Sequence, residues 1–108
     1  MSEAVDDYFT HLADRADSAS VAGITKTCVF EISGAGTWTV IVDNGTIAVR
    51  QGDGKGDCRV ATTAAVFERI LRRELKPTSA YLTGRMKIRG ELAALMRMQP
   101  LLDAVGAP

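Results

Sequence analysis

The sequence contains few of the residues that bind metals or carry out acid–base chemistry. Its 108 residues include one histidine and two cysteines, and the cysteines are not in a CxxC spacing. Zinc sites need several imidazole or thiolate ligands, so no metal site is expected. The single histidine, His11, falls on the polar side of a predicted helix beside Asp7 and Asp14. We expect an exposed, solvated side chain there rather than a catalytic base.

Long apolar runs and a basic leader are also missing. No run approaches the roughly 18 apolar residues that a membrane-spanning helix needs, and the first residues, MSEAVDD, are acidic where a signal peptide is basic. The chain ends in Gly106-Ala107-Pro108, so a Ser-Lys-Leu type peroxisomal address is not expected. Hydrophobic residues make up 46% and charged residues 24%, which is typical of a globular protein. These features predict one soluble, cytoplasmic domain over residues 1–108.

The two cysteines, Cys28 and Cys58, occupy inward positions of predicted strands. Cytoplasmic proteins keep their thiols reduced. The sequence therefore predicts two buried thiols that pack as small hydrophobic residues, rather than a disulfide or a metal pair.

The remaining polar motifs do not form a catalytic set. The segment Gly52–Gly56 (GDGKG) is similar to a phosphate-binding loop, but a strand is predicted after it where a P-loop needs a helix, so a mobile turn is expected. Asp14 and Asp17, like Asp53 and Asp57, form pairs of carboxylates in segments predicted to be exposed. No base accompanies a serine or threonine nucleophile. The sequence therefore predicts no cofactor and argues against an enzyme.

Charge is unevenly distributed, although the formal net charge is zero. Residues 1–57 carry nine acidic and four basic side chains, and residues 58–108 carry nine basic and four acidic ones. The bases between positions 69 and 97 are Arg69, Arg72, Arg73, Lys76, Arg85, Lys87, Arg89 and Arg97. They are interpreted either as a solvated face or as a surface for anionic lipid head groups, acidic ligand ends or an acidic protein. Nucleic acid is not an expected partner, because no recognised motif or stacking platform accompanies the charge.

The first half of the chain predicts a helix followed by four strands. Apolar residues recur at helical spacing in the first segment, at Val5, Tyr8, Phe9, Leu12, Ala13 and Ala16. Alternation predicts strands at Lys26–Ser33, Trp38–Val42, Thr46–Gln51 and Cys58–Thr62. Asp43-Asn44-Gly45 is typical of a type I′ hairpin turn, because Asn and Gly tolerate positive φ.

The second half begins with two predicted helices. Thr63 caps a helix that runs to about Leu75, and Glu68 and Arg72 form an i,i+4 ion pair within it. Lys76-Pro77 ends this helix and begins a short second one.

A strand and a last helix complete the predicted fold. Arg85 to Arg89 alternate as a strand, and Leu92, Leu95 and Met96 recur at helical spacing. This order predicts an α+β fold in which helices cover one face of a single five-stranded, largely antiparallel sheet.

Proline, alanine and glycine residues flank the predicted strand of the second half. A proline, an alanine and a glycine precede a short basic and apolar strand that ends in glycine, at Pro77, Ala80, Gly84, Lys87, Ile88 and Gly90. This pattern resembles the C-terminal half of the sterol carrier protein type 2 family, and the resemblance extends more loosely over nearly the whole chain. It implies that the helices leave an apolar tunnel beside the sheet, and that the ligand is a sterol, a fatty acid, an acyl-coenzyme A or a similar lipid.

Large, soft side chains are frequent at positions predicted to point inward. Each one alone fits an ordinary core, but together they favour a ligand cavity, because Met adapts to irregular ligands and Trp or Tyr places a polar tip at an apolar mouth. The predicted cavity-lining residues are Phe30, Trp38, Val40, Phe67, Leu71, Tyr81, Leu82, Met86, Ile88, Leu95 and Met96. Among them, Leu82 is predicted to plug the mouth of the cavity.

The sequence therefore predicts a non-catalytic carrier of a lipid-like or other hydrophobic small molecule. A second hypothesis is an enzyme of hydrophobic small-molecule metabolism that uses the cavity as a reaction chamber, which inward polar groups at Thr62, Tyr81 or Thr83 would favour. A third is an interaction domain that dimerises through an exposed sheet face or its C-terminal tail. In the carrier, bases around the mouth would contact an anionic membrane or an acidic protein, namely Arg72, Arg73, Lys76, Arg85 and Arg89.

Overall fold

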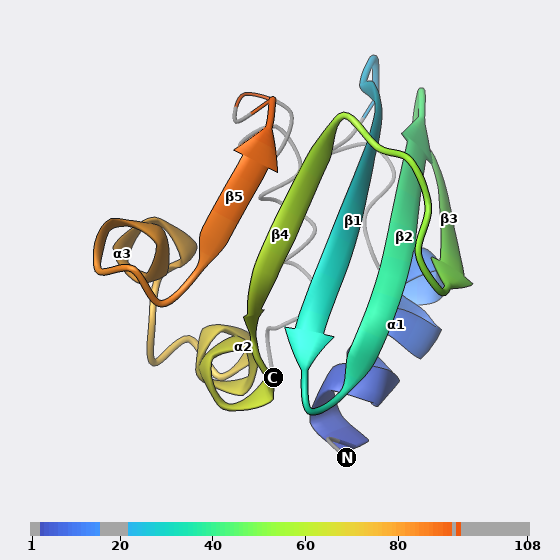
Figure 1. Cartoon of the computed structure of the whole chain (residues 1–108). Coiled ribbons are helices and arrows are strands. Elements are labelled where there is room, and N and C mark those ends of the chain that lie inside the picture. The colour runs from blue at the N-terminus through green and yellow to red at the C-terminus, as the bar shows by residue number, and fades with distance from the viewer. Residues whose placement is uncertain (1–2, 16–21, 92, 94–108) are drawn as a thin grey trace.

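A computed structural model of the chain describes residues 3–15, 22–91 and 93. It contains a five-stranded sheet with the strand order β3-β2-β1-β4-β5 (Figure 1). The elements are α1 (Glu3–Arg15), β1 (Thr25–Ser33), β2 (Gly36–Asp43), β3 (Thr46–Gln51), β4 (Cys58–Thr63), α2 (Ala64–Leu71), α3 (Pro77–Leu82) and β5 (Lys87–Gly90). All neighbouring strands are antiparallel except β1 and β4, which are parallel. The predicted α+β class with a largely antiparallel sheet is confirmed.

Helix α1 lies behind the sheet in Figure 1 and buries the first four residues of the predicted apolar stripe, whereas the side chain of Ala13 and the whole of Ala16 fall outside the described part of the chain. Val5, Tyr8, Phe9 and Leu12 are all buried, and they belong to the same core as the inward residues of β1 and β2. The opposite side of the helix is acidic and exposed. An amphipathic helix of this kind is stabilised mainly by burial of its apolar face.

Two local signals predicted from the sequence are confirmed. Asn44 and Gly45 have positive φ angles of 46° and 92°, as a type I′ turn between β2 and β3 requires. Thr63 caps α2, because its hydroxyl oxygen accepts a hydrogen bond from the backbone N–H of Val66 at 3.2 Å. Both features depend only on residues that are close together in the sequence, so the sequence predicts them without knowledge of the fold.

Helix α2 ends at Leu71, about one turn before the predicted end. Arg73 adopts a left-handed conformation with φ of 61°, and the N–H of Glu74 then donates to the carbonyl of Arg69 at 2.9 Å. This geometry closes the helix and turns the chain toward α3. The predicted pair of Glu68 with Arg72 is present, with 3.6 Å between Oε1 and Nη1.

The connection from β3 to β4 crosses the sheet on the face opposite α1 (Figure 1). The chain has to cross the sheet because two strands, β2 and β1, lie between β3 and β4. The Thr39 hydroxyl donates to the carbonyl of Gly52 at 3.0 Å, and the Asp57 carboxylate accepts from the N–H of Thr27 at 2.8 Å. Val29 and Thr39 point to this face and are buried. The segment predicted as a mobile turn is therefore a crossover loop fastened at both ends.

Cys28 and Cys58 lie directly opposite each other on the parallel strands β1 and β4. Their Cα atoms are 4.8 Å apart, and the two side chains form a disulfide. The prediction of two separate thiols was wrong. Thirty residues separate the cysteines along the chain, and only the β1–β4 register brings them together.

Part of the predicted second half lies outside the described residues. This applies to the last helix at Leu92, Leu95 and Met96 and to the chain beyond it. Strand β5 begins at Lys87, two residues later than predicted. Among the described helices, none is long and apolar enough to cross a membrane.

Candidate functional site

Aromatic side chains fill the space between the sheet and the helices. Phe9 of α1 stacks on Trp38 of β2, with 4.5 Å between ring centroids, and it also lies 5.5 Å from Phe67 of α2. Phe30 of β1 contacts both phenylalanines, at 5.4 Å and 6.2 Å. Tyr8 packs edge-on against Phe9 and Phe67. This cluster, defined by these five residues, provides a large apolar and polarisable interior.

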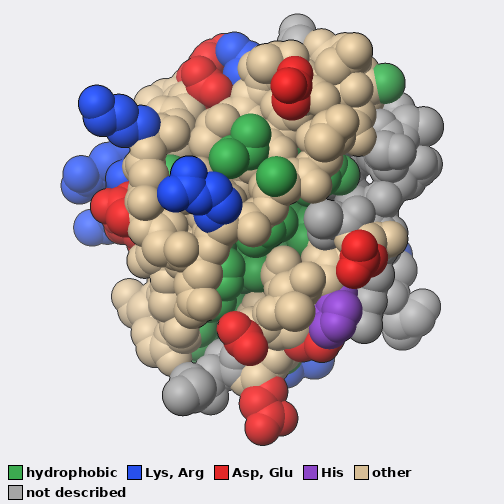
Figure 2. All heavy atoms as spheres, turned by 90° about the vertical axis from the view of Figure 1, so that its right-hand side faces the viewer, with side chains coloured by type: hydrophobic (Ala, Val, Ile, Leu, Met, Phe, Trp, Pro, Cys, Tyr) green, Lys and Arg blue, Asp and Glu red, His purple; other side chains and the backbone are tan. Residues whose placement is uncertain are grey.

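One opening toward this interior lies between α1 and the edge strand β3. It has a volume of about 230 Å³ and is lined by Asp6, Phe9, Thr10, Trp38, Val49 and Gln51. Figure 2 faces this side of the molecule and shows apolar side chains at the bottom of a hollow. Phe9 and Trp38 of the aromatic cluster form walls of this opening, and Asp6, Thr10 and Gln51 form its polar rim. The sequence did not indicate this opening, because it depends on how far α1 lies from the edge of the sheet.

A second groove lies where the sequence predicted the mouth of a cavity. It has a volume of about 540 Å³ and is lined by Tyr81, Leu82, Gly84, Met86, Lys87, Ile88 and Arg89. Tyr81 is 40% exposed and Leu82 is 80% exposed, so their predicted inward orientation is wrong. Helix α3 has only six residues, lies beyond the β5 edge and packs inward through Ala80. The next two residues of this short helix, Tyr81 and Leu82, point away from the core because successive side chains lie on different sides of a helix.

The other predicted lining residues occupy mixed environments. Phe30, Trp38, Val40, Phe67 and Met86 are buried, and Leu71 and Ile88 are half-buried. The structure brings Phe30, Trp38 and Phe67 together in the aromatic cluster. Leu95 and Met96 fall outside the described residues. The role of these residues in lining a ligand cavity stays a prediction.

Two of the hydroxyl groups that would favour a reaction chamber form hydrogen bonds with backbone carbonyls. The hydroxyl of Thr62 donates to the carbonyl of Arg85 at 2.8 Å, and that of Thr83 donates to the carbonyl of Ser79 at 2.7 Å. His11 Nδ1 lies 3.0 Å from Asp7 on the outer side of α1. Within the described residues, no group of three His, Cys, Asp or Glu side chains is placed to hold a metal ion.

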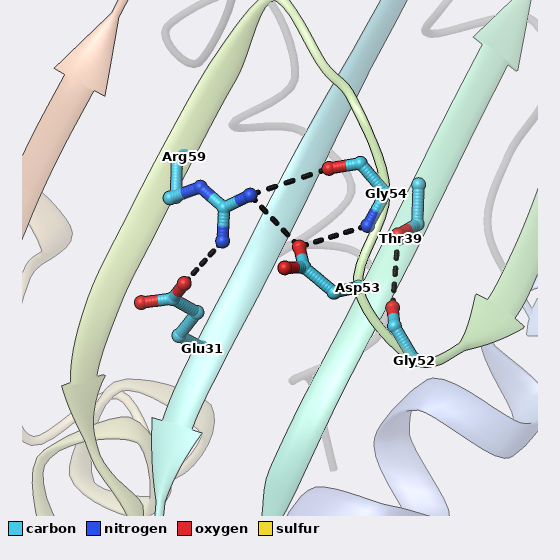
Figure 3. A network of polar contacts seen from close by, with 6 residues as sticks. All are labelled: Glu31, Thr39, Gly52, Asp53, Gly54 and Arg59. Carbon is cyan, nitrogen blue, oxygen red and sulfur yellow. Dashed lines mark hydrogen bonds and ion pairs between the residues drawn. The ribbon is translucent and has the colours of Figure 1, made fainter.

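A polar cluster lies on the sheet face that the crossover loop covers (Figure 3). The Arg59 guanidinium donates to Glu31, to the Asp53 carboxylate at 2.8 Å and to the carbonyl of Gly54 at 3.2 Å. Hydrogen bonds to Asp53 and Glu31 raise the pKa of Arg59 above its ordinary value. The hydrogen bond from Arg59 lowers the pKa of Asp53. Sequence reasoning missed this cluster because its members come from β1, β4 and the loop.

The basic residues predicted to flank the mouth differ in their surroundings. Arg72 pairs with Glu68 and with Glu74, whose Oε2 lies 2.9 Å from Nε, so its charge is balanced locally. Lys76 and Arg85 are exposed on either side of α3, and neither has a carboxylate partner among the described residues. Lys87 and Arg89 border the same groove as Leu82, so the positive charge around Leu82 comes from these two residues together with Lys76 and Arg85.

Comparison with known families agrees with this architecture. The model of the SCP-2 sterol transfer family matches residues 6–103. The chain belongs to this family. Hydroxysteroid dehydrogenase-like protein 2 of Homo sapiens is 26% identical over 110 residues, which cover 98% of this chain and 26% of that protein. The chain thus spans about a quarter of the length of this relative.

Solved structures of sterol carrier proteins share the fold. The sterol carrier protein domain 2 of Helicoverpa armigera matches with a TM-score of 0.76 and 19% identity, over 96% of this chain and 90% of that one. Sterol Carrier Protein-2 of Aedes aegypti, solved in complex with the C16 fatty acid palmitate, matches with a TM-score of 0.71 and 17% identity, over 96% and 98%. Family membership supports a role in lipid binding or transfer.

Proposed function

We propose that this domain binds a long-chain lipid, of the fatty acid or sterol class, in the apolar interior between the sheet and the helices, and carries it between membranes. The aromatic cluster is the observation that carries this proposal. Its rings come from both layers, and two of them line the opening between α1 and β3. Affinity would come mainly from burial of apolar ligand surface, at about 25 cal/mol per Å², offset by ordering costs.

Family membership and the Aedes aegypti complex support the same class of ligand. That complex holds a C16 fatty acid, an apolar chain with one charged end. An apolar interior with a polar rim, such as the Asp6, Thr10 and Gln51 side of the opening, suits a ligand of this kind.

The direct test is to identify what the purified protein carries. Native mass spectrometry followed by organic extraction should reveal a bound lipid, and a fluorescent fatty acid should bind with a dissociation constant near 1 μM, about −8 kcal/mol. If several lipid classes, titrated to their solubility limits, gave no saturable signal, the carrier function would be rejected.

Replacing Leu82 with glutamate should weaken lipid binding without destabilising the fold. Leu82 is 80% exposed and borders the α3–β5 groove, so we expect the free energy of unfolding to change by less than about 0.5 kcal/mol. A carboxylate at the rim of the groove would lie against the bound lipid and would lose part of its hydration there. We expect the affinity to fall about tenfold, which is about 1.4 kcal/mol.

The matched control for Leu82→Glu is Thr78→Glu, which adds the same charge to an exposed position of the same helix outside the groove. Fluorescent fatty acid titration and thermal unfolding are measured on both variants. Equal affinity in the two variants would show that the α3–β5 groove is not the entrance, and would direct attention to the opening between α1 and β3.

We also propose that the bases beside α3 bring this mouth to anionic membranes while the lipid passes. Reversing Lys76 and Arg85 to glutamate should slow fatty acid transfer between anionic vesicles at least tenfold at low salt, because each base near such a surface contributes about 1 kcal/mol. Added salt should slow wild-type transfer in the same way, since the Debye length is about 8 Å at physiological salt.

The control for this pair is Arg50→Glu with Lys55→Glu, an equal charge change at exposed positions remote from α3. Equilibrium fatty acid affinity should be unchanged in both double variants, because neither touches the aromatic cluster. If neither added salt nor the Lys76 and Arg85 reversal changed the transfer rate, these bases would be solvated side chains without a role in membrane contact.

A further inference from the structure

A pocket of about 300 Å³ lies on the sheet face opposite the aromatic cluster, beside the crossover loop. It is lined by Glu31, Asp53, Arg59, Ala61, Lys87 and Arg89. The register explains why these residues meet: Glu31 of β1 is paired with Ala61 of β4, and Ala61 is paired with Lys87 of β5. Ala61 has no side chain beyond Cβ, so longer side chains surround it and leave a hollow above it.

Three cations share this small space. Arg59 and Arg89 are direct cross-strand partners, and Lys87 is paired with the neighbouring position on the same face. Side chains at such directly opposed positions have Cβ atoms about 5 Å apart, and like charges there are destabilising. The strands therefore hold positive charge together at a local energetic cost.

The two carboxylates of the pocket both bind the same cation, Arg59. Glu31 and Asp53 both accept hydrogen bonds from Arg59, and the carbonyl of Gly54 completes its partners (Figure 3). Neither Lys87 nor Arg89 has a carboxylate partner among the described residues. Arg59 is thus held in place by its partners, while the lining as a whole, with three cations and two carboxylates, carries a net charge of +1.

We propose that this pocket binds a small phosphate monoester. A phosphate monoester carries close to two negative charges at neutral pH, so a positively charged pocket attracts it more strongly than a carboxylate or a sulfate ester, which carries one. The Arg89 guanidinium presents a planar fork that suits a phosphate group, and Lys87 adds a point charge. A volume of about 300 Å³ is at the lower limit for ligand pockets, so it suits a ligand of the size of glycerol 3-phosphate.

The same phosphate group has two possible sources, a soluble metabolite or the head group of a lipid such as phosphatidic acid. The pocket lies on the opposite face of the sheet from the aromatic cluster, although Lys87 and Arg89 also border the α3–β5 groove. Glycerol 3-phosphate has no acyl chain, so its titration measures this pocket without involving the apolar interior.

The test is a titration of the whole protein with glycerol 3-phosphate. Binding is monitored through the backbone amide NMR signals of Ala61, Lys87 and Arg89. We expect saturation with a dissociation constant of about 1 mM. The double variant Lys87→Gln with Arg89→Gln should bind at least tenfold more weakly. Methyl sulfate, which has similar tetrahedral oxygens but one charge, should also bind at least tenfold more weakly than glycerol 3-phosphate.

The matched control is Arg50→Gln with Lys55→Gln, which removes two bases outside the pocket lining. This control should retain the wild-type affinity, and thermal unfolding verifies that both double variants are folded. Equal weakening in the two double variants would mean that net charge attracts phosphate without a site and would overturn the proposal. No saturable shift in the wild type, with either glycerol 3-phosphate or phosphatidic acid vesicles, would overturn it as well.

Vesicles containing phosphatidic acid distinguish the two sources. If the Lys87 and Arg89 variant loses binding to these vesicles while the Arg50 and Lys55 control retains it, the pocket takes a lipid head group. If only glycerol 3-phosphate binding depends on Lys87 and Arg89, the pocket takes a soluble phosphate monoester.

Discussion

Replacing Phe9 with alanine is expected to lower the free energy of unfolding by about 4 kcal/mol. The side chain is 1% exposed, and it contacts four other rings of the aromatic cluster. Truncation would remove a large apolar side chain and leave a cavity that the surrounding rings cannot fill. For a domain of this size the melting temperature should fall by about 20 °C. Chemical denaturation followed by Trp38 fluorescence measures the change directly.

Thr10→Ala is the matched control for Phe9→Ala, because Thr10 is the next residue of α1 and is exposed. We expect this control to change the free energy of unfolding by less than about 0.5 kcal/mol. A loss below about 1.5 kcal/mol for Phe9→Ala would contradict close packing of the cluster. It would indicate instead that Phe9 borders a space kept open for ligand, which fatty acid titration of the same variant would examine.

Breaking the disulfide between Cys28 and Cys58 is expected to cost about 3.5 kcal/mol of stability, because a cross-link over 30 residues restricts the unfolded chain. The two cysteines join the central strands β1 and β4, so the bond connects the two halves of the sheet. Urea denaturation with and without a thiol reductant measures this difference.

The double variant Cys28→Ala with Cys58→Ala serves as the control, since its stability should not respond to reductant. Two titratable thiols in the oxidised protein, with no effect of reductant on wild-type stability, would contradict the disulfide. Disulfides persist in oxidising compartments and are rare in the cytosol. The cytoplasmic location stays a prediction, which thiol trapping in intact cells would test.

The features predicted correctly from the sequence depend on short stretches of chain. The stripe of α1, the Asn44-Gly45 turn and the Thr63 cap each follow from residues within one or two turns of one another. Hydrophobic periodicity and backbone preference are local properties, so they are visible without the fold. The same patterns indicated the α+β class. The resemblance to the family that the comparisons established came from the motif between Pro77 and Gly90.

The features that were missed depend on pairs of residues distant in the sequence. The parallel register of β1 and β4 brings Cys28 to Cys58, and the antiparallel register of β4 and β5 brings Arg59 to Arg89. Alternation predicts which face a strand residue occupies, but not which strand lies beside it or in what register. The orientation of Leu82 was missed for a related reason, because α3 is placed by its packing beyond the edge of the sheet.

The sequence by itself thus determined the class of fold and the apolar character of the interior, because burial of periodic hydrophobic residues leaves few ways to build a single core. The motif between Pro77 and Gly90 indicated the family. Tertiary structure alone decided the disulfide, the crossover loop and the cation cluster above Ala61. Each of these requires strands from both halves of the chain to be placed side by side. Strand order and register result from the free energy of the whole sheet, and no local segment encodes them.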